Sequence, residues 1–371
     1  MLYYHVIVDL DIGGAEMMLL NLLKNIRDTE NHIVISLKSK GKLLNDFKAI
    51  GIQVIELGMT KSLIGSIRAL GNLNRLIRND ITLVAWMYHG VAIGLLFKLI
   101  KRNIRLISNI RHSDVGFLNN RLNTYVILRL IGFLSNRIDT IIYNGDKARV
   151  NHNNIGYLPQ NEIVIGNGVD ISRFRTIDPK DRYTNWRNKR KKLLTVSRFH
   201  KIKGIEILIE ALAMLKNELG FDYFEITLIG SALDDGNEEL MQLISKNNLK
   251  ENVILHGIQD NIQYYYEQGD IFILPSISEA FPNVLIEAMA GGLICISTAV
   301  GDVPKILGSE FLVSPGNKIE LAFKISEILS ISTSRAIEIG ENNQEIIQKK
   351  FDIKNIIETY TYVLEGKHRV V

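Results

Sequence analysis

The sequence predicts an α/β protein with two doubly wound, Rossmann-like domains, each a parallel β-sheet covered by helices. The 371 residues exceed what a single hydrophobic core usually holds, which favours two domains. Short apolar segments alternate with amphipathic segments along the whole chain, as in sheets whose helices cover both faces. Residues 178–192 are polar and lack apolar periodicity, so we interpret them as a connector. We place the boundary near residues 167–192, with domains at 1–168 and 169–355.

Each predicted strand is a short apolar segment followed by polar or glycine residues. In the first half the strands are expected at His5–Val8, His32–Ser36, Gln53–Glu56, Ile81–Met87, Arg105–Ile110 and Thr140–Tyr143. In the second half they are expected at Leu193–Ser197, Glu225–Ile229, Val253–Leu255, Ile271–Leu274 and Ile294–Thr298. Helical patterns include Glu16–Lys24, Ser62–Ile77, Ile205–Lys216 and a terminal helix at Ile356–Leu364.

The composition is that of an ordinary globular protein, with 46% hydrophobic and 23% charged residues. A single cysteine, Cys295, excludes an intrachain disulfide and fits a reducing compartment. A strand pattern begins almost at the first residue, and no apolar run approaches the roughly 18 to 20 residues of a membrane span. We therefore expect a cytoplasmic protein.

Positive charge is concentrated in one part of the chain. Residues 61–150 contain 14 Lys and Arg against 4 Asp and no Glu, whereas the whole chain has a net charge of only +4. Such a face suits nucleic acid, an anionic membrane surface or solvent alone. Because no nucleic-acid-binding motif accompanies the charge, nucleic acid is not the expected partner.

The strongest functional signal is a pair of glutamates around the start of a helix. The apolar run Ile271–Leu274 predicts a buried strand, and Pro282 fits the first position of the helix that follows. The N-terminus of a helix beside a strand end suits a phosphate group. Glu279 precedes this helix and Glu287 lies inside it, so a ligand with its diphosphate over the helix start would meet a carboxylate at each end. Sugar hydroxyls are groups that such carboxylates bind.

The stretch Ser276–Ala290 resembles the Glu-x7-Glu signature of retaining GT-B glycosyltransferases of family 4, also called group 1. Motifs described below match the same family in the same order over nearly the whole chain, and resemble those of enzymes that build bacterial surface polysaccharides. The resemblance implies the GT-B architecture, with two Rossmann-like domains facing across a cleft. The N-terminal domain would bind the acceptor, the C-terminal domain the nucleotide-sugar donor, and the last helix, 356–371, would cross back onto the N-terminal domain.

On the donor side, Arg198 and Lys203 follow a predicted strand in an Arg-x4-Lys pattern. In isolation such a pair is usually a pair of surface residues. The resemblance assigns both to the donor diphosphate, Glu287 to the ribose and Glu279 to the donor sugar. Further donor-binding positions implied by the resemblance are Gly230, Gly257, Ile258, Ala280, Phe281, Pro282, Asn283 and Val284.

Two positions depart from the family pattern. Ala232 replaces the second glycine of a Gly-x-Gly turn that begins at Gly230, and Ala280 replaces the glycine that usually follows the first glutamate. These departures leave the identity of the donor sugar open. They also keep one alternative, a non-catalytic nucleotide-sugar-binding subunit. A second alternative is an epimerase-like GT-B enzyme, against which the combined Arg-x4-Lys and Glu-x7-Glu pattern argues.

On the acceptor side, Gly13 and Gly14 follow the first strand, where glycine lets a backbone approach a ligand closely. The resemblance makes this the loop that faces the donor phosphates and the acceptor. His89 and His112 each follow a strand, and His112 matches a position that contacts the donor sugar near the reacting carbon. Arg111 is a further acceptor-side candidate that could bind phosphate or form a structural ion pair.

The predicted reaction moves a sugar, from a UDP-sugar by preference, to a hydroxyl of a lipid-linked or oligosaccharide acceptor. No residue is marked as a second, nucleophilic carboxylate of the glycosidase type. Catalysis is then expected to rest on positioning and charge stabilisation, with His112, Arg198, Lys203 and Glu279 as the catalytic candidates. Without an Asp-x-Asp motif or a Cys/His cluster, neither a metal nor another cofactor is expected.

Two amphipathic stretches lie in the basic region. In Ser62–Ile77 the apolar stripe is Leu63, Ile64, Ile67, Leu70, Leu73 and Ile77, beside Lys61, Arg68, Arg75 and Arg78. In Asn120–Ser135 it is Tyr125, Leu128, Leu130, Ile131 and Leu134, beside Arg121 and Arg129. Such stripes usually face a core, but the charge excess supports the hypothesis of peripheral contact with an anionic membrane.

Overall fold

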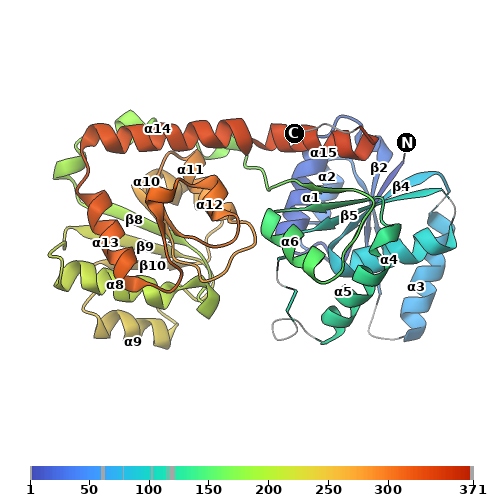
Figure 1. Ribbon diagram of the computed structural model, residues 1–371, viewed down its shortest axis with the longest axis horizontal. Coiled ribbons are helices and arrows are strands. Elements are labelled where there is room, and N and C mark those ends of the chain that lie inside the picture. The colour runs from blue at the N-terminus through green and yellow to red at the C-terminus, as the bar shows by residue number, and fades with distance from the viewer. Residues whose placement is uncertain are drawn as a thin grey trace. The chain divides into compact units, whose positions relative to one another are not determined.

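The computed structural model describes residues 2–59, 63–77, 79–101, 103–113, 115–116 and 122–367, without the side chains of 63, 64, 66 and 67. The chain folds as two units. The N-terminal unit contains residues 1–167 and 354–371, and the C-terminal unit contains residues 168–353. Each is a parallel sheet flanked by helices (Figure 1), so the prediction of two Rossmann-like α/β domains is confirmed.

The sheet of the N-terminal unit has seven parallel strands in the order β3-β2-β1-β4-β5-β6-β7. The strands are β1 Tyr3–Ile7, β2 His32–Ser36, β3 Gln53–Glu56, β4 Ile81–Trp86, β5 Ile104–Ile110, β6 Thr140–Tyr143 and β7 Glu162–Val164. The helices are α1 Gly14–Asn25, α2 Leu44–Ala49, α3 Leu63–Leu76, α4 Met87–Ile100, α5 Leu122–Leu134, α6 Asp146–Asn154 and α15 Ile353–Glu365. Strands β4 and β6 are buried at every residue because helices cover both faces of the sheet.

The C-terminal unit repeats the plan with six parallel strands in the order β10-β9-β8-β11-β12-β13. The strands are β8 Lys191–Val196, β9 Phe224–Ile229, β10 Val253–Gly257, β11 Ile271–Leu274, β12 Ile294–Thr298 and β13 Leu312–Val313. The helices are α7 Pro179–Arg182, α8 Ile205–Asn217, α9 Glu238–Lys246, α10 Ile262–Gln268, α11 Asn283–Ala290, α12 Val303–Ile306, α13 Lys318–Leu329 and α14 Thr333–Lys350.

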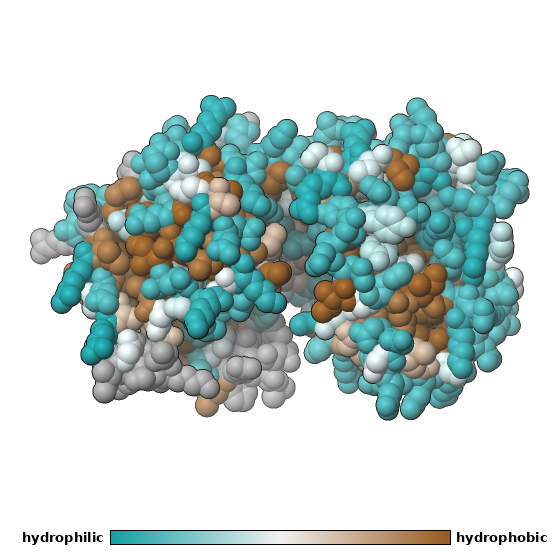
Figure 2. All heavy atoms as spheres, turned by 180° about the vertical axis from the view of Figure 1, so that it is seen from behind, coloured by the Kyte–Doolittle hydropathy of each residue, from teal (hydrophilic) through white to brown (hydrophobic). Residues whose placement is uncertain are grey.

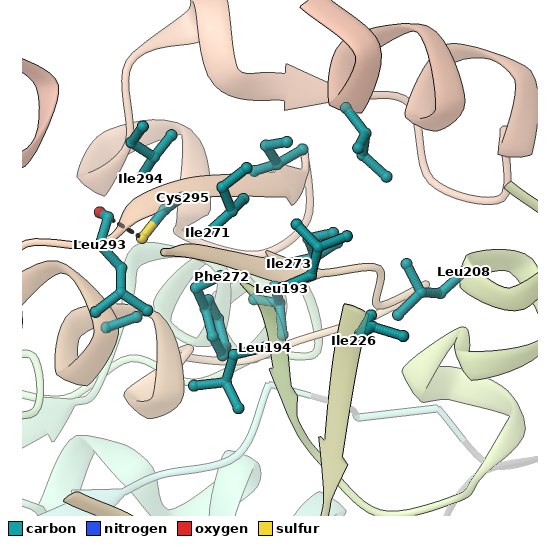
Figure 3. Close-up of a cluster of buried hydrophobic side chains, with 14 of the residues drawn as sticks. Leu193, Leu194, Leu208, Ile226, Ile271, Phe272, Ile273, Leu293, Ile294 and Cys295 are labelled. Carbon is teal, nitrogen blue, oxygen red and sulfur yellow. Dashed lines mark hydrogen bonds between the residues drawn. The ribbon is translucent and has the colours of Figure 1, made fainter. Parts of the chain in front are cut away.

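The order of the C-terminal sheet reverses between β8 and β11. The two strands pair directly, Leu193 with Ile271 and Leu194 with Phe272, and their side chains meet in the buried core shown in Figure 3. Ligands of doubly wound sheets bind beyond the carboxyl ends of the strands at such a reversal. The loops that leave β8 and β11 are therefore where a ligand of this unit is expected.

The interpretation of residues 178–192 as a connector was wrong. Tyr183 and Trp186 are fully buried and belong to the core of the C-terminal unit. The buried guanidinium of Arg182 donates to the carbonyls of Gly269 and Gly291, which lets a polar segment pack inside. The sequence pattern did not reveal this segment as part of the core, because its buried charged side chains are satisfied by backbone carbonyl oxygens and show no apolar periodicity.

Helix α15 is fixed to the N-terminal sheet by polar contacts. Arg105 of β5 donates to the carbonyl oxygens of Val363 and Leu364, and Asn109 bonds the hydroxyl of Tyr360. These bonds cap carbonyls at the end of α15 that the helix itself leaves open. The chain therefore returns to the N-terminal unit at residue 354, and the first segment of that unit ends at residue 167.

Candidate functional site

The loops at the carboxyl ends of β8, β9 and β11 cross at very short range. The amide of Ser197 donates to Ile229, and a Cβ built on Gly230 would lie 1.6 Å from the Ser197 carbonyl oxygen. A Cβ on Gly204 would lie 2.1 Å from the carbonyl oxygen of Pro275. Both glycines also have positive φ angles, of 135° and 68°. Only glycine fits such crossings, and they bring the Arg198–Lys203 loop against the Glu279 loop.

Lys203 and Glu279 form an ion pair within this crossing. Lys203 Nζ lies 2.6 Å from Glu279 Oε1, and the same oxygen accepts a 2.7 Å hydrogen bond from Ser276 Oγ. The amide of Ile277 donates to the carbonyl of Ile202 and ties the two loops together. The Glu279 side chain is 10% exposed, so its charge depends on these partners. Sequence reasoning placed both charged residues here but gave no role to Ser276.

Arg198 lies at the start of the same loop and is exposed. Among the residues that the structure describes, it forms no salt bridge. Its guanidinium is therefore available for a phosphate group, whereas the ammonium of Lys203 is already paired with Glu279. The two predicted diphosphate-binding cations occupy one loop but differ in their partners.

Glu287 is held on α11 by an aromatic hydroxyl. Tyr266 of α10 donates a 2.9 Å hydrogen bond to Glu287 Oε2 and contacts the carbonyl oxygen of Val284 at 3.3 Å. Burial raises the pKa of Glu287 above its ordinary value of 4.5, while the bond from Tyr266 and the charge of Arg173 oppose the rise. Tyr266 was missed at the sequence level, because one tyrosine among three consecutive ones carries no signal of its partner.

Helix α11 begins one residue later than predicted. Pro282 is the N-cap, with φ −89° and ψ 82°, and makes no side-chain capping bond, so the helix starts at Asn283. The uncapped helix start carries the positive end of the helix dipole. Phe281 packs against the ring of Phe351, which anchors the loop. Ala280 and Val284 are partly buried beside it.

The turn after β9 has an alanine in the left-handed conformation. Ala232 adopts the left-handed conformation, φ 58°, that glycine adopts most readily. The amide of Gly230 donates to the Gly257 carbonyl, and that of Gly257 donates to Leu233, which joins the ends of β9 and β10. Ile258 is 75% exposed next to this turn, so its side chain is open to a ligand.

In the N-terminal unit, the loop between β1 and α1 is covered by its own glutamate. Gly13 is the N-cap of α1, and a Cβ there would meet Glu16 Oε2 at 2.3 Å. Burial raises the pKa of Glu16, with smaller increases from Asp9 and Asp11. Gly14, by contrast, faces open space. A ligand phosphate approaching this loop would meet a carboxylate that must first move or take up a proton.

Arg111 is a structural residue. It is 9% exposed, donates to Asn167 Oδ1 and to the hydroxyl of Tyr360, and its guanidinium lies 5.8 Å from the centre of the Trp86 ring. Its expected acceptor-side role does not fit this burial. Because its two terminal nitrogens donate to Asn167 and Tyr360, Arg111 fastens the end of the first segment, at Asn167, to helix α15.

His89 and His112 lie at the ends of neighbouring strands and are both exposed. His89 follows a strained turn, in which Met87 has a φ of 58° and sends Tyr88 inward and His89 outward. Burial by the surrounding protein, and then the charge of Lys38, lower the pKa of His89. His112 directly follows β5. Both are therefore placed to meet a ligand at the carboxyl edge of the N-terminal sheet.

The arrangement in the C-terminal unit can bind a polyhydroxylated anion. It combines an exposed cation, Arg198, a paired cation, Lys203, an uncapped helix start and two carboxylates held by hydroxyl donors. Within the described part of the chain, no three His, Cys, Asp or Glu side chains gather as metal ligands would. That the protein needs no metal stays a prediction.

Two sequence families match the chain in succession. The profile of "Glycosyltransferase Family 4" matches residues 12–173, and that of "Glycosyl transferases group 1" matches residues 190–330. The chain belongs to these glycosyltransferases. It is therefore a transferase enzyme, and its two α/β units are those of the GT-B fold.

Individual relatives agree with this assignment. The capsular polysaccharide biosynthesis glycosyltransferase CapH of Staphylococcus aureus is 21% identical over 96% of this chain and 97% of its own length. The N-acetylgalactosamine-N,N'-diacetylbacillosaminyl-diphospho-undecaprenol 4-alpha-N-acetylgalactosaminyltransferase of Campylobacter jejuni is 28% identical over 53% of this glycosyltransferase. That alignment covers 52% of the relative, so the chain spans about half of its length.

A solved structure matches along the whole chain. Alr3699/HepE of Anabaena, crystallised in complex with UDP, has a TM-score of 0.84 and 22% identity, and the match covers 99% of this glycosyltransferase and 100% of HepE. At this level of identity the likeness shows the fold alone.

Proposed function

We propose that this glycosyltransferase is a retaining enzyme that transfers a sugar from a nucleotide-diphosphate sugar, a UDP-sugar by preference, in the synthesis of a surface polysaccharide. The Lys203–Glu279 pair carries the proposal, because it lies where the sheet order reverses and where α11 begins without a side-chain cap. The UDP bound by HepE and the polysaccharide named for CapH support the donor and the process.

In the proposed complex the donor diphosphate lies over the start of α11. Arg198 and the helix start bind its oxygens directly. Lys203 turns part of its hydrogen bonding from Glu279 to the phosphate, which frees Glu279 Oε1 to accept from a hydroxyl of the donor sugar. Glu287, already oriented by Tyr266, accepts hydrogen bonds from the ribose. Glu279 thus exchanges part of its bonding to Lys203 for a sugar hydroxyl, and Glu287 adds ribose hydroxyls to its bond from Tyr266. Little binding energy is therefore lost to reorganisation of the two carboxylates.

The chemistry proposed for this site needs no protein nucleophile. The bond between the anomeric carbon and the diphosphate oxygen breaks, the acceptor oxygen bonds to the same face of the sugar, and its proton passes to the leaving phosphate. Negative charge grows on the diphosphate during this step, and Arg198, Lys203 and the start of α11 stabilise it. His112 is the residue of the N-terminal unit that we assign to the donor sugar.

The acceptor proposed is a lipid-linked or oligosaccharide hydroxyl, and contact with an anionic membrane would bring the enzyme to it. Helices α4 and α5 expose large apolar side chains, and Figure 2 shows hydrophobic surface on the N-terminal unit. The exposed residues are Leu96, Leu99 and Ile100 of α4 and Leu122, Val126, Leu130 and Phe133 of α5. Exposed Arg129 and Arg137 lie in or just after α5. No helix among the described residues is long and apolar enough to cross a bilayer.

The apolar stripes of the sequence prediction divide between core and surface. On α5, Leu128 and Ile131 are buried whereas Leu130 is 53% exposed. Leu73 of α3 and Ile77 just after it are buried. The side chains of Leu63, Ile64 and Ile67 lie outside the described part, as do residues Lys61, Arg78 and Arg121. The membrane proposal therefore rests on α4 and α5.

Sedimentation with vesicles tests the membrane contact. Phe133 is 83% exposed, and Phe133→Ser should weaken sedimentation with anionic vesicles at low salt. Phe323→Ser on α13, 52% exposed in the other unit, is the matched control and should sediment as the parent does. Equal sedimentation of both variants would reject this surface.

A turnover assay tests the proposed activity. The enzyme is incubated with UDP-glucose, UDP-N-acetylglucosamine or GDP-mannose and a lipid-linked oligosaccharide fraction, and release of the nucleoside diphosphate is followed. We expect acceptor-dependent release with one UDP-sugar, retained in excess chelator, and a product with the donor's anomeric configuration by NMR. Donor binding without turnover would favour the non-catalytic subunit, and loss of activity in chelator restored by a divalent ion would reject metal independence.

A further inference from the structure

A cavity of about 590 Å³ lies in the N-terminal unit, at the amino ends of its strands. Tyr3 begins β1 and His32 begins β2, and both line the cavity. The other walls are the segment after α1, with Arg27 and Asp28, and one face of α15, with Thr361. Helices α1 and α15 and strand β2 lie close together in Figure 1. Because the loops of the proposed donor and acceptor sites are at the carboxyl ends of strands, this cavity is a separate place.

The floor of the cavity presents a fixed hydrogen-bond donor. The indole N–H of Trp86 donates to His5 Nδ1 at 3.3 Å, so His5 carries its proton on Nε2 and donates to His32 Nδ1 at 2.9 Å. His32 in turn carries its proton on Nε2. Only 3% of His32 is exposed, and among the described residues its Nε2 has no hydrogen-bond partner. Burial lowers the pKa of His32 to about 4, so at neutral pH the ring is an uncharged N–H donor.

The charges around the cavity balance. Arg27, Lys354 and Lys367 are matched by Asp28, Glu358 and Glu365. A phosphate or a metal ion would favour an excess of one sign, whereas a neutral ligand with many hydroxyls can use both donors and acceptors. The Tyr3 ring lies parallel to that of His32, with centres 4.6 Å apart, and adds a flat apolar surface. Sugar rings present the matching combination of hydroxyls and C–H faces.

We propose that this cavity binds a neutral saccharide of one or two rings, separately from the nucleotide-sugar site. Its volume falls within the range of about 300–1,000 Å³ that small-molecule sites occupy. His32 Nε2 donates to a ring or hydroxyl oxygen, and the carboxylates of Asp28 and Glu358 accept from hydroxyls. The site would hold a unit of glycan at the amino edge of the sheet. The proposal does not depend on the proposed activity.

Saturation-transfer NMR tests the site, with glucose, galactose, N-acetylglucosamine and N-acetylgalactosamine as probes in the presence of excess UDP. Thr361 lines the cavity from α15, and Thr361→Trp would fill it from a partly exposed position. Thr359→Trp changes the same helix outside the cavity lining and serves as the control. We expect transfer to at least one sugar with the parent and with Thr359→Trp, and its loss with Thr361→Trp.

A second variant distinguishes a blocked cavity from a misfolded protein. His32→Phe keeps an aromatic ring against Tyr3 but removes the N–H, and should weaken binding while circular dichroism remains that of the parent. Absence of transfer to all four sugars in the folded parent would overturn the proposal. So would equal transfer in all variants, or displacement of the sugars by millimolar inorganic phosphate.

Discussion

The two units of this glycosyltransferase use the carboxyl ends of their sheets differently. In the C-terminal unit, crossing loops hold Lys203 against Glu279, and Tyr266 of α10 bonds Glu287 of α11. In the N-terminal unit, Arg111 is buried in structural contacts, while His89 and His112 are exposed. The C-terminal unit thus has its charged groups positioned before a ligand binds, whereas the N-terminal unit presents solvent-exposed histidines. The difference fits a donor site that must fix a defined diphosphate and an acceptor side that receives a larger molecule.

The largest effect on the rate is expected in the C-terminal unit, where the charged groups are already positioned. Lys203→Ala removes the cation paired with Glu279 and should lower kcat for sugar transfer by about 10²–10³. Lys201→Ala changes an exposed lysine of the same loop and should leave the rate nearly unchanged. The measurement is the initial rate at saturating donor. A loss of less than a few fold in Lys203→Ala would place the charge stabilisation elsewhere.

Neighbouring substitutions in the N-terminal unit sharpen the contrast between structure and function. Arg111→Ala removes the buried guanidinium that donates to Asn167 and to the hydroxyl of Tyr360, and should cost roughly 2–3 kcal/mol of unfolding free energy. His112→Ala alters an exposed residue and should change stability by less than about 0.5 kcal/mol while slowing transfer. Denaturant unfolding and the rate assay measure the two effects. If Arg111→Ala kept its stability and lost activity, Arg111 would regain an acceptor role.

The pH dependence of stability tests whether the buried carboxylate of Glu287 destabilises the protein when no ligand is bound. Burial raises its pKa, so the folded state holds this proton more tightly than the unfolded chain. The free energy of unfolding should therefore fall as pH rises from the ordinary pKa of 4.5 through the raised value. Glu287→Gln removes this dependence, so its Tm should exceed that of the parent at about pH 8 and approach it near pH 4. An equal difference at both pH values would contradict the assignment.

The smallest effect concerns the turn that lacks the family's second glycine. Ala232 has a left-handed φ of 58°, which an alanine adopts at a cost of about 1 kcal/mol. Ala232→Gly should raise stability by up to about 1 kcal/mol, and Ala232→Val should lower it, since a β-branched residue resists this conformation. Thermal unfolding of the two variants checks the opposite signs. Destabilisation by glycine would show that the alanine methyl group has a packing role.

Much of the fold could be predicted from periodicity. The ranges of β2, β3, β6, β11 and β12 were predicted to the residue. Strands β6, β11 and β12 are buried throughout, and β3 is a short apolar pair between two polar residues. The short strands β7 and β13 were missed, since two or three residues carry no pattern. The segment 178–192 was misread because Arg182 and Lys191 are buried with backbone partners.

The site could be predicted only in part. The two glutamates and Lys203 were found because a strand end, a helix start and charged residues coincide in the sequence. Tyr266 was not assigned a role because it bonds Glu287 from a separate helix, which leaves no local spacing, and Ser276 was not because a serine three residues before a glutamate is no distinctive pattern. Arg111 was open between two roles, and its burial depends on α15, about 250 residues further along the chain. Long-range packing therefore decides what local motifs leave undetermined.

The central claim is that the C-terminal unit holds a nucleotide diphosphate between Glu287 and the Lys203–Glu279 pair. Calorimetric titration of the protein with UDP and with GDP, repeated on Glu287→Ala, tests it most directly. We predict binding of UDP that is lost or strongly weakened in Glu287→Ala, with GDP binding less tightly. Equal affinity of the parent and Glu287→Ala for the nucleotide, or no binding of either nucleotide to the folded parent, would contradict the claim.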